Sequence, residues 1–286
     1  MGTNWSAKIY LPANISETEI VQCLNLVFTD YINVFSLWEP RAFISRFNAA
    51  SVGVVLDVPD LFQSIWQAAI EIKQQTGGAF NPFCFDEISN RGFNPSVEMQ
   101  LDTAASYVGN PFPLGQGVIA KTDCPQIDLN AIAKGAAVDA MSNELRRLGC
   151  VSFLVEIGGE FSAQGLKEDG QPWWVDIETP IPAGILHRVA LSGFSVATSG
   201  NTHKQNLRRN DINLGHILLT EHSVDAFKSV SVLHPHCMYA DAWATALYAS
   251  PETAVERANS HELAVIFQFP SGEISYSEML KRHFVN

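Results

Sequence analysis

The stretch Asp-Leu-Asn-Ala-Ile-Ala-Lys-Gly-Ala-Ala-Val-Asp, at residues 128–139, predicts a loop that runs directly into an amphipathic helix. Small residues surround one basic side chain, Lys134. A pyrophosphate or a metal ion could therefore approach the free backbone N–H groups of the helix start. The stretch matches neither a P-loop nor a Rossmann fingerprint. An ordinary helix start packed in a hydrophobic core would look the same, so these residues alone leave both interpretations open.

The composition is that of a globular protein with a hydrophobic core, because 47% of the 286 residues are hydrophobic and 17% are charged. A net charge of −12 argues against nucleic acid as a partner, since nucleic-acid binding needs a basic face. The five cysteines are scattered and form no Cys-x-x-Cys pair. The sequence therefore predicts neither a disulfide framework nor a cysteine zinc site. No apolar run reaches the length of a transmembrane helix.

The first part of the chain carries two clear helix signals. Residues 3–11 alternate between apolar and polar side chains, which predicts a strand. A helix then begins with a capping box, Ser16 and Glu19, and continues to about residue 36. Residues 36–48 are expected to form a loop, and a second helix spans about 59–75.

The remaining chain mixes helices and strands without strict alternation. Residues 79–118 lack periodicity, which is typical of functional or mobile segments. The helix that follows residue 128 is expected to end near 148, before Gly149. The other predicted elements are a strand at 151–157, short hairpin strands between 172 and 233, helices at about 239–249 and from 250 onward, a strand at 263–269 and a short C-terminal helix. This order favours an α+β fold over a doubly wound sheet.

A second candidate site lies in Tyr-Ala-Asp-Ala-Trp-Ala-Thr-Ala-Leu, residues 239–247. On a helix, Asp241 and Thr245 are four residues apart and share one face. Their carboxylate and hydroxyl oxygens are hard ligands that suit Mg²⁺. An Asp favoured by the helix dipole, with a Thr bonded back to its own helix, is the structural alternative.

Three further segments carry weaker signals. Residues 194–201 run from a strand into a polar Ser-Gly-Asn turn that could contact a phosphate, or could be a plain hairpin turn. Residues 155–160 end a buried strand with Gly-Gly-Glu, where glycines permit close backbone approach. His216 could move a proton near neutral pH, although a single histidine beside a strand is more often only hydrogen-bonded.

Taken in order, these segments resemble one family, the ApbE-type FAD:protein FMN transferases. The resemblance covers nearly the whole chain. The matching segments are M-G-T-N-W-S at 1–6, I-S-R-F-N at 44–48, T-G-G-A-F-N-P at 76–82, G-F at 92–93, D-L-N-A-I-A-K-G-A-A-V-D at 128–139, E-I-G-G-E at 156–160, S-V-A-T-S-G-N at 195–201, H-I-L at 216–218 and A-D-A-W-A-T-A-L at 240–247.

The resemblance implies a reaction. In this family a Ser or Thr hydroxyl of an acceptor protein attacks the FMN-side phosphorus of FAD, AMP leaves, and FMN stays attached through a phosphoester. The resemblance also implies an Mg²⁺ ion held by the backbone carbonyl of Ala131 and the side chains of Asp241 and Thr245. His216 matches the family histidine that assists proton transfer, so His216 and Asp241 are the predicted catalytic residues.

The resemblance further implies a fold and a set of contacts to FAD. We expect one ApbE-like, T-fold-like domain over residues 1–286, with two packed α/β halves and mixed, mainly antiparallel sheets. The residues expected against FAD are Met1, Trp38, Ala79, Phe80, Asn81, Asp128, Lys134 and Leu218. No secretory leader precedes the first strand. The protein is therefore expected in the cytoplasm, or exported or membrane-anchored if a leader has been removed.

Three segments depart from the family pattern. Asn81 stands where the family usually has Asp, and residues 219–223 read Leu-Thr-Glu-His-Ser instead of Asp-Pro-x-Thr-Gly. Phe85-Asp86 and Ser89-Asn90-Arg91 replace a Gly-Pro pair and an Asn-Leu-Trp segment. These changes spare the predicted metal ligands. They leave two alternatives: an FAD pyrophosphatase that gives FMN and AMP, and a non-catalytic protein that binds or stores FAD.

Overall fold

The structure, a computed structural model, describes residues 3–95, 109–113, 115, 117–177, 187–200, 207–209, 212–219 and 226–282. The helices are α1 (Glu17–Phe35), α2 (Phe43–Ala49), α3 (Asp60–Gln75), α4 (Phe85–Asn90), α5 (Asn130–Arg147), α6 (Cys237–Ala249), α7 (Pro251–Ser260) and α8 (Glu278–Lys281). The strands are β1 (Trp5–Ile9), β2 (Val55–Asp57), β3 (Val118–Ala120), β4 (Phe153–Ile157), β5 (Glu160–Gln164), β6 (Trp173–Ile177), β7 (His187–Leu191), β8 (Phe194–Gly200), β9 (Leu207–Arg209), β10 (Ile212–Leu214), β11 (Ser229–His234), β12 (Ala264–Gln268) and β13 (Ile274–Tyr276).

A seven-stranded sheet forms the framework of the molecule, in the order β1-β4-β5-β8-β11-β12-β13. Every neighbouring pair in it is antiparallel, as are the three short two-stranded sheets. The α+β class is therefore confirmed, and the sheets that the described residues form are antiparallel rather than mixed.

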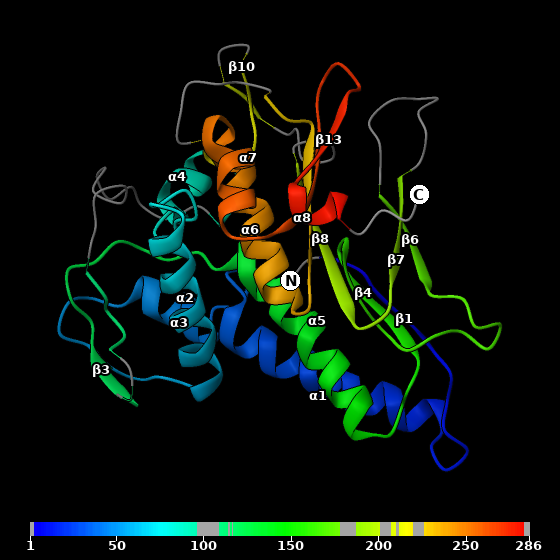
Figure 1. The fold of residues 1–286 in the computed structure, drawn as a ribbon. Helices are drawn as coiled ribbons and strands as arrows, with labels where there is room; N and C mark the ends of the chain where they lie inside the picture. Colours follow the sequence, from blue (N-terminus) through cyan, green and yellow to red (C-terminus); the bar gives the residue numbers. More distant parts are fainter. Residues whose placement is uncertain are drawn as a thin grey trace.

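The two faces of the large sheet pack against different layers. Side chains alternate along β4, so Phe153, Val155 and Ile157 join the core beneath α5 and α6, while Leu154 joins a second core on the opposite face. The small β6–β7 sheet covers that opposite face and contributes Trp173 to the second core. The α5–α6 pair and the β6–β7 pair can be followed on the two sides of the sheet in Figure 1.

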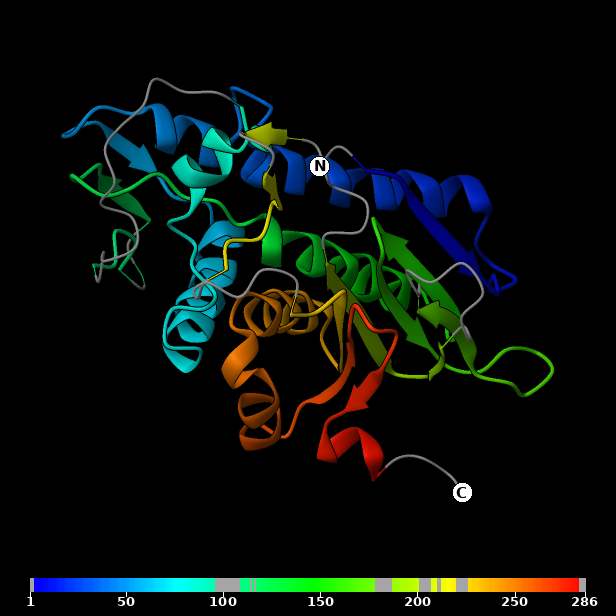
Figure 2. The same ribbon diagram turned by 90° about the horizontal axis from the view of Figure 1, so that it is seen from above.

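Helices α5 and α6 pack against each other at the centre of the fold. Figure 2 shows α5 (green) between α1 (blue) and the α6–α7 pair (orange). Gly135 permits the close approach, because a Cβ at this position would lie 2.4 Å from the backbone carbonyl oxygen of Cys237. Nearly every side chain of α6 is buried, as expected of a helix enclosed by other elements on all sides. The two predicted sites are therefore brought onto one helix pair.

The segment between α1 and α5 builds the other half of the molecule. Helices α2, α3 and α4 and the β2–β3 pair gather on the side away from β6–β7 (Figure 1). An aromatic cluster holds this half together: Phe62 of α3 contacts Phe43 of α2 and Phe112, with ring centroids 4.6 and 4.7 Å apart. This half supplies residues 79–95, which lead toward the start of α5.

Several boundaries differ from the prediction. The capping box of α1 is confirmed, since Ser16 accepts a hydrogen bond from the backbone N–H of Glu19 and Glu19 caps Ser16 in return. The predicted loop at 36–48 is wrong in its second part, because α2 forms there. Its N-cap, Ala42, makes no side-chain bond, so no start signal marks this helix, which is stabilised by burial of Phe43 and Phe47.

Short strands account for most of the other differences. β1 is shorter than the predicted strand 3–11, and Trp5 at its start is 38% exposed. The three-residue strands β2, β3 and β13 were not predicted, and α4 lies inside the stretch 79–118 that showed no periodicity. Helix α6 begins two residues before the predicted position, 239.

No helix among the described residues is long and apolar enough to span a lipid bilayer.

Candidate active site

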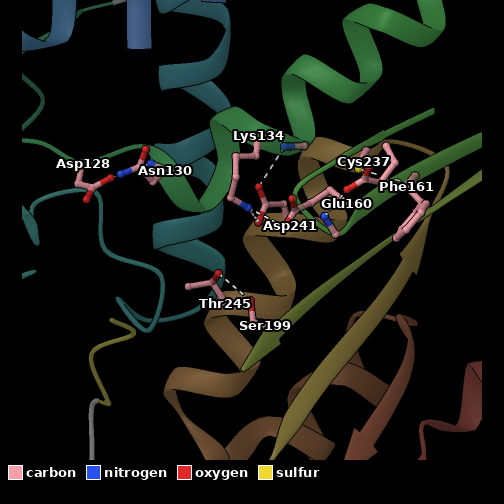
Figure 3. A network of polar contacts seen from close by, with 12 residues as sticks. Asp128, Asn130, Lys134, Glu160, Phe161, Ser199, Cys237, Asp241 and Thr245 are labelled. Atoms are coloured by element: carbon pink, nitrogen blue, oxygen red, sulfur yellow. Dashed lines mark hydrogen bonds and ion pairs between the residues drawn. The ribbon is translucent and has the colours of Figure 1, made fainter. Parts of the chain in front are cut away.

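The α5–α6 contact brings Asp241 against the first turns of α5 (Figure 3). The backbone N–H of Gly135 donates a hydrogen bond of 3.0 Å to Oδ2 of Asp241. Asp241 is 3% exposed, so its carboxylate lies between the two helices rather than in solvent. An N–H inside an α-helix ordinarily donates to the carbonyl four residues earlier, which for Gly135 is Ala131. Asp241 therefore competes with the Ala131 carbonyl for this donor.

Lys134 lies beside the same carboxylate. Its Nζ is 3.5 Å from Oδ1 of Asp241 and 2.6 Å from Oε1 of Glu160, the first residue of β5. Burial opposes the charge on Lys134, but the carboxylates of Asp241 and Glu160 raise its pKa above the ordinary value. The lysine is therefore cationic at neutral pH, and the cluster carries one positive and two carboxylate groups.

Thr245 lies one turn beyond Asp241 on α6 and contacts β8. Its Oγ1 is 3.0 Å from Oγ of Ser199, and either hydroxyl can be the donor. Figure 3 shows this pair on the same side of α6 as Asp241. When the Thr245 hydroxyl donates its hydrogen bond to Ser199, a lone pair on Oγ1 of Thr245 is available to another partner.

These groups fit a magnesium ion by their chemistry. A carboxylate, a hydroxyl and a backbone carbonyl are hard oxygen ligands, and Mg²⁺ uses few protein ligands and keeps water or phosphate oxygens for the others. A carbonyl has two lone pairs, so Ala131 can serve its helix and a cation together. Within the described part of the chain, no group of three or more His, Cys, Asp and Glu side chains gathers as a metal site. The predicted ligand set contains only one such side chain and does not need that cluster.

Asp128 organises the loop that precedes α5. Its Oδ1 accepts the backbone N–H of Asn130 at 2.7 Å, and its Oδ2 accepts the side-chain amide of Asn94 at 2.8 Å. The backbone N–H of Asp128 donates to the carbonyl of Pro82 at 2.8 Å. Asp128 thus ties the helix start to two segments of the other half, and it is 6% exposed.

Three predicted FAD contacts, Ala79, Phe80 and Asn81, lie directly before Pro82 and so belong to this neighbourhood. Ala79 and Phe80 are buried, and the backbone N–H of Phe80 donates to the hydroxyl of Thr76 at the end of α3. Oδ1 of Asn81 accepts the backbone N–H of Phe83 at 3.1 Å. This bond holds the turn that follows the Gly77-Gly78 helix end and leads toward Asp128.

His216 reaches the same neighbourhood through α4 and the residues after it. Its ring packs on Phe93, with centroids 5.8 Å apart, and Phe93 precedes the Asn94 that binds Asp128. Arg91 donates a hydrogen bond of 3.1 Å to the carbonyl of Gly215. The histidine therefore lies beside the part of the site formed by residues 91–94.

The remaining predicted contacts are less tied to this centre. Trp38 follows α1 and is 65% exposed, which leaves its ring face available to a flat ligand. Leu218 is half-buried beside the buried Ile217. Met1 lies outside the described residues.

Four residues of the site were not predicted, namely Asn94, Asp139, Glu160 and Ser199. Glu160 and Ser199 stand in segments that the sequence marks as glycine turns, but their partners lie on other elements. Asp139 accepts the backbone N–H groups of Cys237 and Met238 at 2.8 and 2.9 Å, and so caps α6 from α5. Asp139, Glu160 and Ser199 stand within the family motifs, but the motifs do not predict which residues these side chains contact.

Comparison with known proteins identifies the family and the fold. Curated relatives named FAD:protein FMN transferase include proteins of Vibrio cholerae, 25% identical over 100% of this chain and 91% of the relative, and of Haemophilus influenzae, 27% identical over 93% and 83%. The apo crystal structure of the flavinyl transferase ApbE from Pseudomonas stutzeri has the same fold, with a TM-score of 0.84 and 24% identity over 100% of this chain and 95% of that one. The profile of the ApbE family matches residues 1–267, so the chain belongs to the ApbE family.

Proposed function

We propose that this chain is an FAD:protein FMN transferase that depends on Mg²⁺, attaches FMN to a Ser or Thr hydroxyl of an acceptor protein and releases AMP. Family membership and the names of its relatives support the activity. The observation that carries the proposal is the buried contact between Asp241 and the start of α5, where a backbone N–H of the helix is drawn to the carboxylate.

The proposed metal ligands are the carbonyl of Ala131, the carboxylate of Asp241 and the hydroxyl of Thr245. Gly135 supports this set, because only a residue without a side chain lets α6 approach α5 so closely. Ser199 would orient the Thr245 hydroxyl through their 3.0 Å contact. Bound there, Mg²⁺ would act as a Lewis acid on the pyrophosphate and offset part of its charge.

The loop and helix start would hold FAD. Asp128 keeps residues 128–130 and the Phe80–Asn81 segment together, and Trp38 offers an exposed ring face to a flat ring system. The ammonium group of Lys134 would stabilise phosphate charge beside the cation. Phosphoryl-type transfer depends mainly on such positioning and charge neutralisation, which suits this set of side chains.

His216 is proposed to accept the proton of the acceptor hydroxyl. As that proton leaves, the hydroxyl oxygen forms a bond to the FMN-side phosphorus, and the bond between this phosphorus and the bridging oxygen breaks. The electron pair of the broken bond leaves with AMP. The contact of His216 with Phe93 would hold the ring beside residues 91–94.

The experiment is to incubate the purified protein with FAD, with and without Mg²⁺, and with candidate acceptor proteins that carry an exposed Ser or Thr. Transfer predicts flavin fluorescence on the denatured acceptor band and one AMP released for each FMN attached. Both signals should disappear when EDTA removes the metal.

Two results would overturn the proposal. Release of FMN and AMP without any labelled acceptor would identify a pyrophosphatase. Tight binding of FAD that yields neither AMP nor a labelled acceptor would identify a storage protein.

A further inference from the structure

Glu160 begins β5 directly after a tight turn. Gly158 and Gly159 have φ angles of 61° and 100°, which residues with side chains rarely adopt, so the chain can reverse here within two residues. The pairing of Ile157 with Glu160 closes the β4–β5 hairpin. The hairpin delivers the Glu160 carboxylate to the α5–α6 contact, where the residue is 4% exposed (Figure 3).

Lys134 lies unequally between two carboxylates. Its Nζ is 2.6 Å from Glu160, which is a short charge-assisted hydrogen bond, and 3.5 Å from Asp241, which is the outer limit of one. The difference means that Glu160 holds the ammonium group and Asp241 shares it only weakly. Oδ2 of Asp241 is meanwhile held by the backbone N–H of Gly135.

A lysine in this position competes with a divalent cation. Two like charges a few ångströms apart repel strongly where water is largely excluded, and Lys134 and a cation on Asp241 would be such neighbours. An ammonium group that moved onto Asp241 would also occupy the lone pairs that the cation needs. The cation site therefore requires a group that keeps Lys134 off Asp241.

We propose that Glu160 is a positioning residue that draws the Lys134 ammonium away from Asp241 and so keeps Asp241 open to the divalent cation. This inference rests on the cation site of the proposed function. It assigns the Gly-Gly-Glu turn a role: the turn places a second carboxylate where it binds the lysine and not the metal.

The Glu160→Gln variant removes the charge but keeps the size of the side chain. Lys134 is then left with Asp241 as its carboxylate partner, and the site also loses one negative charge. Both effects weaken cation binding. We expect the dissociation constant for Mg²⁺, measured by calorimetry on the protein alone and with FAD present, to rise at least about tenfold.

Two further variants separate the effect of the released lysine from the effect of the lost charge. Glu156→Gln removes the same charge from the same hairpin, but Glu156 bonds Ser6 and the N–H of Gly159 rather than Lys134, so its affinity for Mg²⁺ should stay within about twofold of wild type. The double variant Glu160→Gln/Lys134→Met removes the ammonium group that competes with the cation together with the carboxylate that binds this ammonium group. Its affinity should return to within about threefold of wild type, because neither a stray ammonium nor a net change of charge remains.

The outcomes are distinguishable. Wild-type affinity in Glu160→Gln would overturn the inference and leave the cation site standing. A double variant as weak as the single variant, with an unchanged melting temperature, would also overturn it, because the lysine would not be the cause. Absence of Mg²⁺ binding by the wild-type protein, alone and with FAD, would overturn the cation site of the proposed function and this inference with it. A crystal structure of metal-free Glu160→Gln should show Lys134 closer to Asp241 than the present 3.5 Å.

Discussion

Two carboxylates join α5 to α6, and each accepts backbone N–H groups from the other helix. Asp139 of α5 accepts the N–H groups of Cys237 and Met238 at 2.8 and 2.9 Å. Asp241 of α6 accepts one N–H, that of Gly135, at 3.0 Å and has the Lys134 ammonium at 3.5 Å. The chemical group is the same in both places, and its partners differ.

The difference separates a structural carboxylate from a candidate ligand. Both oxygens of Asp139 are held by the first turn of α6, whose own N-cap, His236, makes no side-chain cap bond. Asp241 has a backbone donor on one oxygen only, and the Lys134 ammonium near its other oxygen is held more closely by Glu160. A buried carboxylate at a helix contact is therefore a candidate metal ligand when backbone donors do not use up its oxygens.

The largest expected effect comes from Asp241→Asn. The amide keeps the shape of the carboxylate and can accept from Gly135, but it loses the charge that a divalent cation needs. We expect Mg²⁺-dependent release of AMP to fall more than about 100-fold, with the secondary structure seen by circular dichroism unchanged. Turnover within threefold of wild type would remove Asp241 from the ligand set.

Gly135→Ala tests the spacing of the two helices. The added Cβ would lie 2.4 Å from the carbonyl oxygen of Cys237 and 2.9 Å from the Cβ of Asp241, and the backbone cannot yield locally. We expect the free energy of unfolding to fall by about 1–3 kcal/mol, with a parallel loss of Mg²⁺ affinity. In an unobstructed helix the same change stabilises the protein, so a rise in stability measured by urea denaturation would contradict the close contact.

Asp139→Ala should lower stability more than it lowers Mg²⁺ affinity. It leaves the N–H groups of Cys237 and Met238 without their carboxylate, which costs about 1–2 kcal/mol. Thermal unfolding and Mg²⁺ titration of the same preparation provide the comparison. A loss of affinity as large as that of Asp241→Asn would mean that the two carboxylates do not have separate roles.

The Asp139→Asn variant adds a pH test. Burial raises the pKa of Asp139 above its ordinary value, although the N–H groups of Met238 and Cys237 and the charges of His236 and Arg146 oppose the shift. The folded state thus binds this proton more tightly than the unfolded state. The stabilisation by this bound proton is fully present at pH values below the pKa that Asp139 has in the unfolded state. It is lost as the pH rises through the pKa that Asp139 has in the folded state. Wild type should therefore lose stability relative to Asp139→Asn between acidic and neutral pH, as followed by urea denaturation.

The smallest expected effect comes from Ser199→Ala. It removes the hydroxyl that contacts Thr245 at 3.0 Å, and we expect Mg²⁺ affinity to fall by about tenfold or less, the value of one hydrogen bond. Ser195→Ala is the matched control on the same strand, because the buried Oγ of Ser195 has no hydrogen-bond partner in the described structure. Equal effects of the two variants would argue against a role for Ser199 in orienting Thr245.

Local signals in the sequence predicted the elements that depend on local interactions. The Ser16–Glu19 capping box marks the start of α1, and Gly149, with a φ of 82°, follows the end of α5. The strands β2, β3 and β13 are three residues long, which is too short for an alternation of apolar and polar side chains to reveal them, and β2 and β3 also depend on each other across a long stretch of chain. Helix α2 has no capping residue to mark its start and is stabilised by burial of Phe43 and Phe47, so the sequence did not predict it either.

The site also has a part that the sequence predicts and a part that depends on the fold. Spacing on one helix is enough to pair Asp241 with Thr245, and the family resemblance named Ala131 and Lys134. Neither could predict that Lys134 lies between two carboxylates, because Glu160 comes from a strand that reaches α5 only in the folded protein. The described structure brings Asp241, Thr245 and Lys134 together, whereas it shows no contact between Trp38 and that cluster.

The pairing of β1 with β4 has a consequence for the timing of folding. Ser6 of β1 contacts Glu156 of β4, 150 residues further along, and the N–H of Gly158 in the β4–β5 turn bonds the carbonyl of Asn4. On a ribosome that adds 5–20 residues per second, β1 waits roughly 8–30 s for this partner. Closing so long a loop is also slow compared with forming a helix. The turn that delivers Glu160 thus pairs with a strand synthesised long before it, whereas α6, which carries Asp241 and Thr245, follows later in the chain. The capacity to bind a cation should therefore appear late in folding.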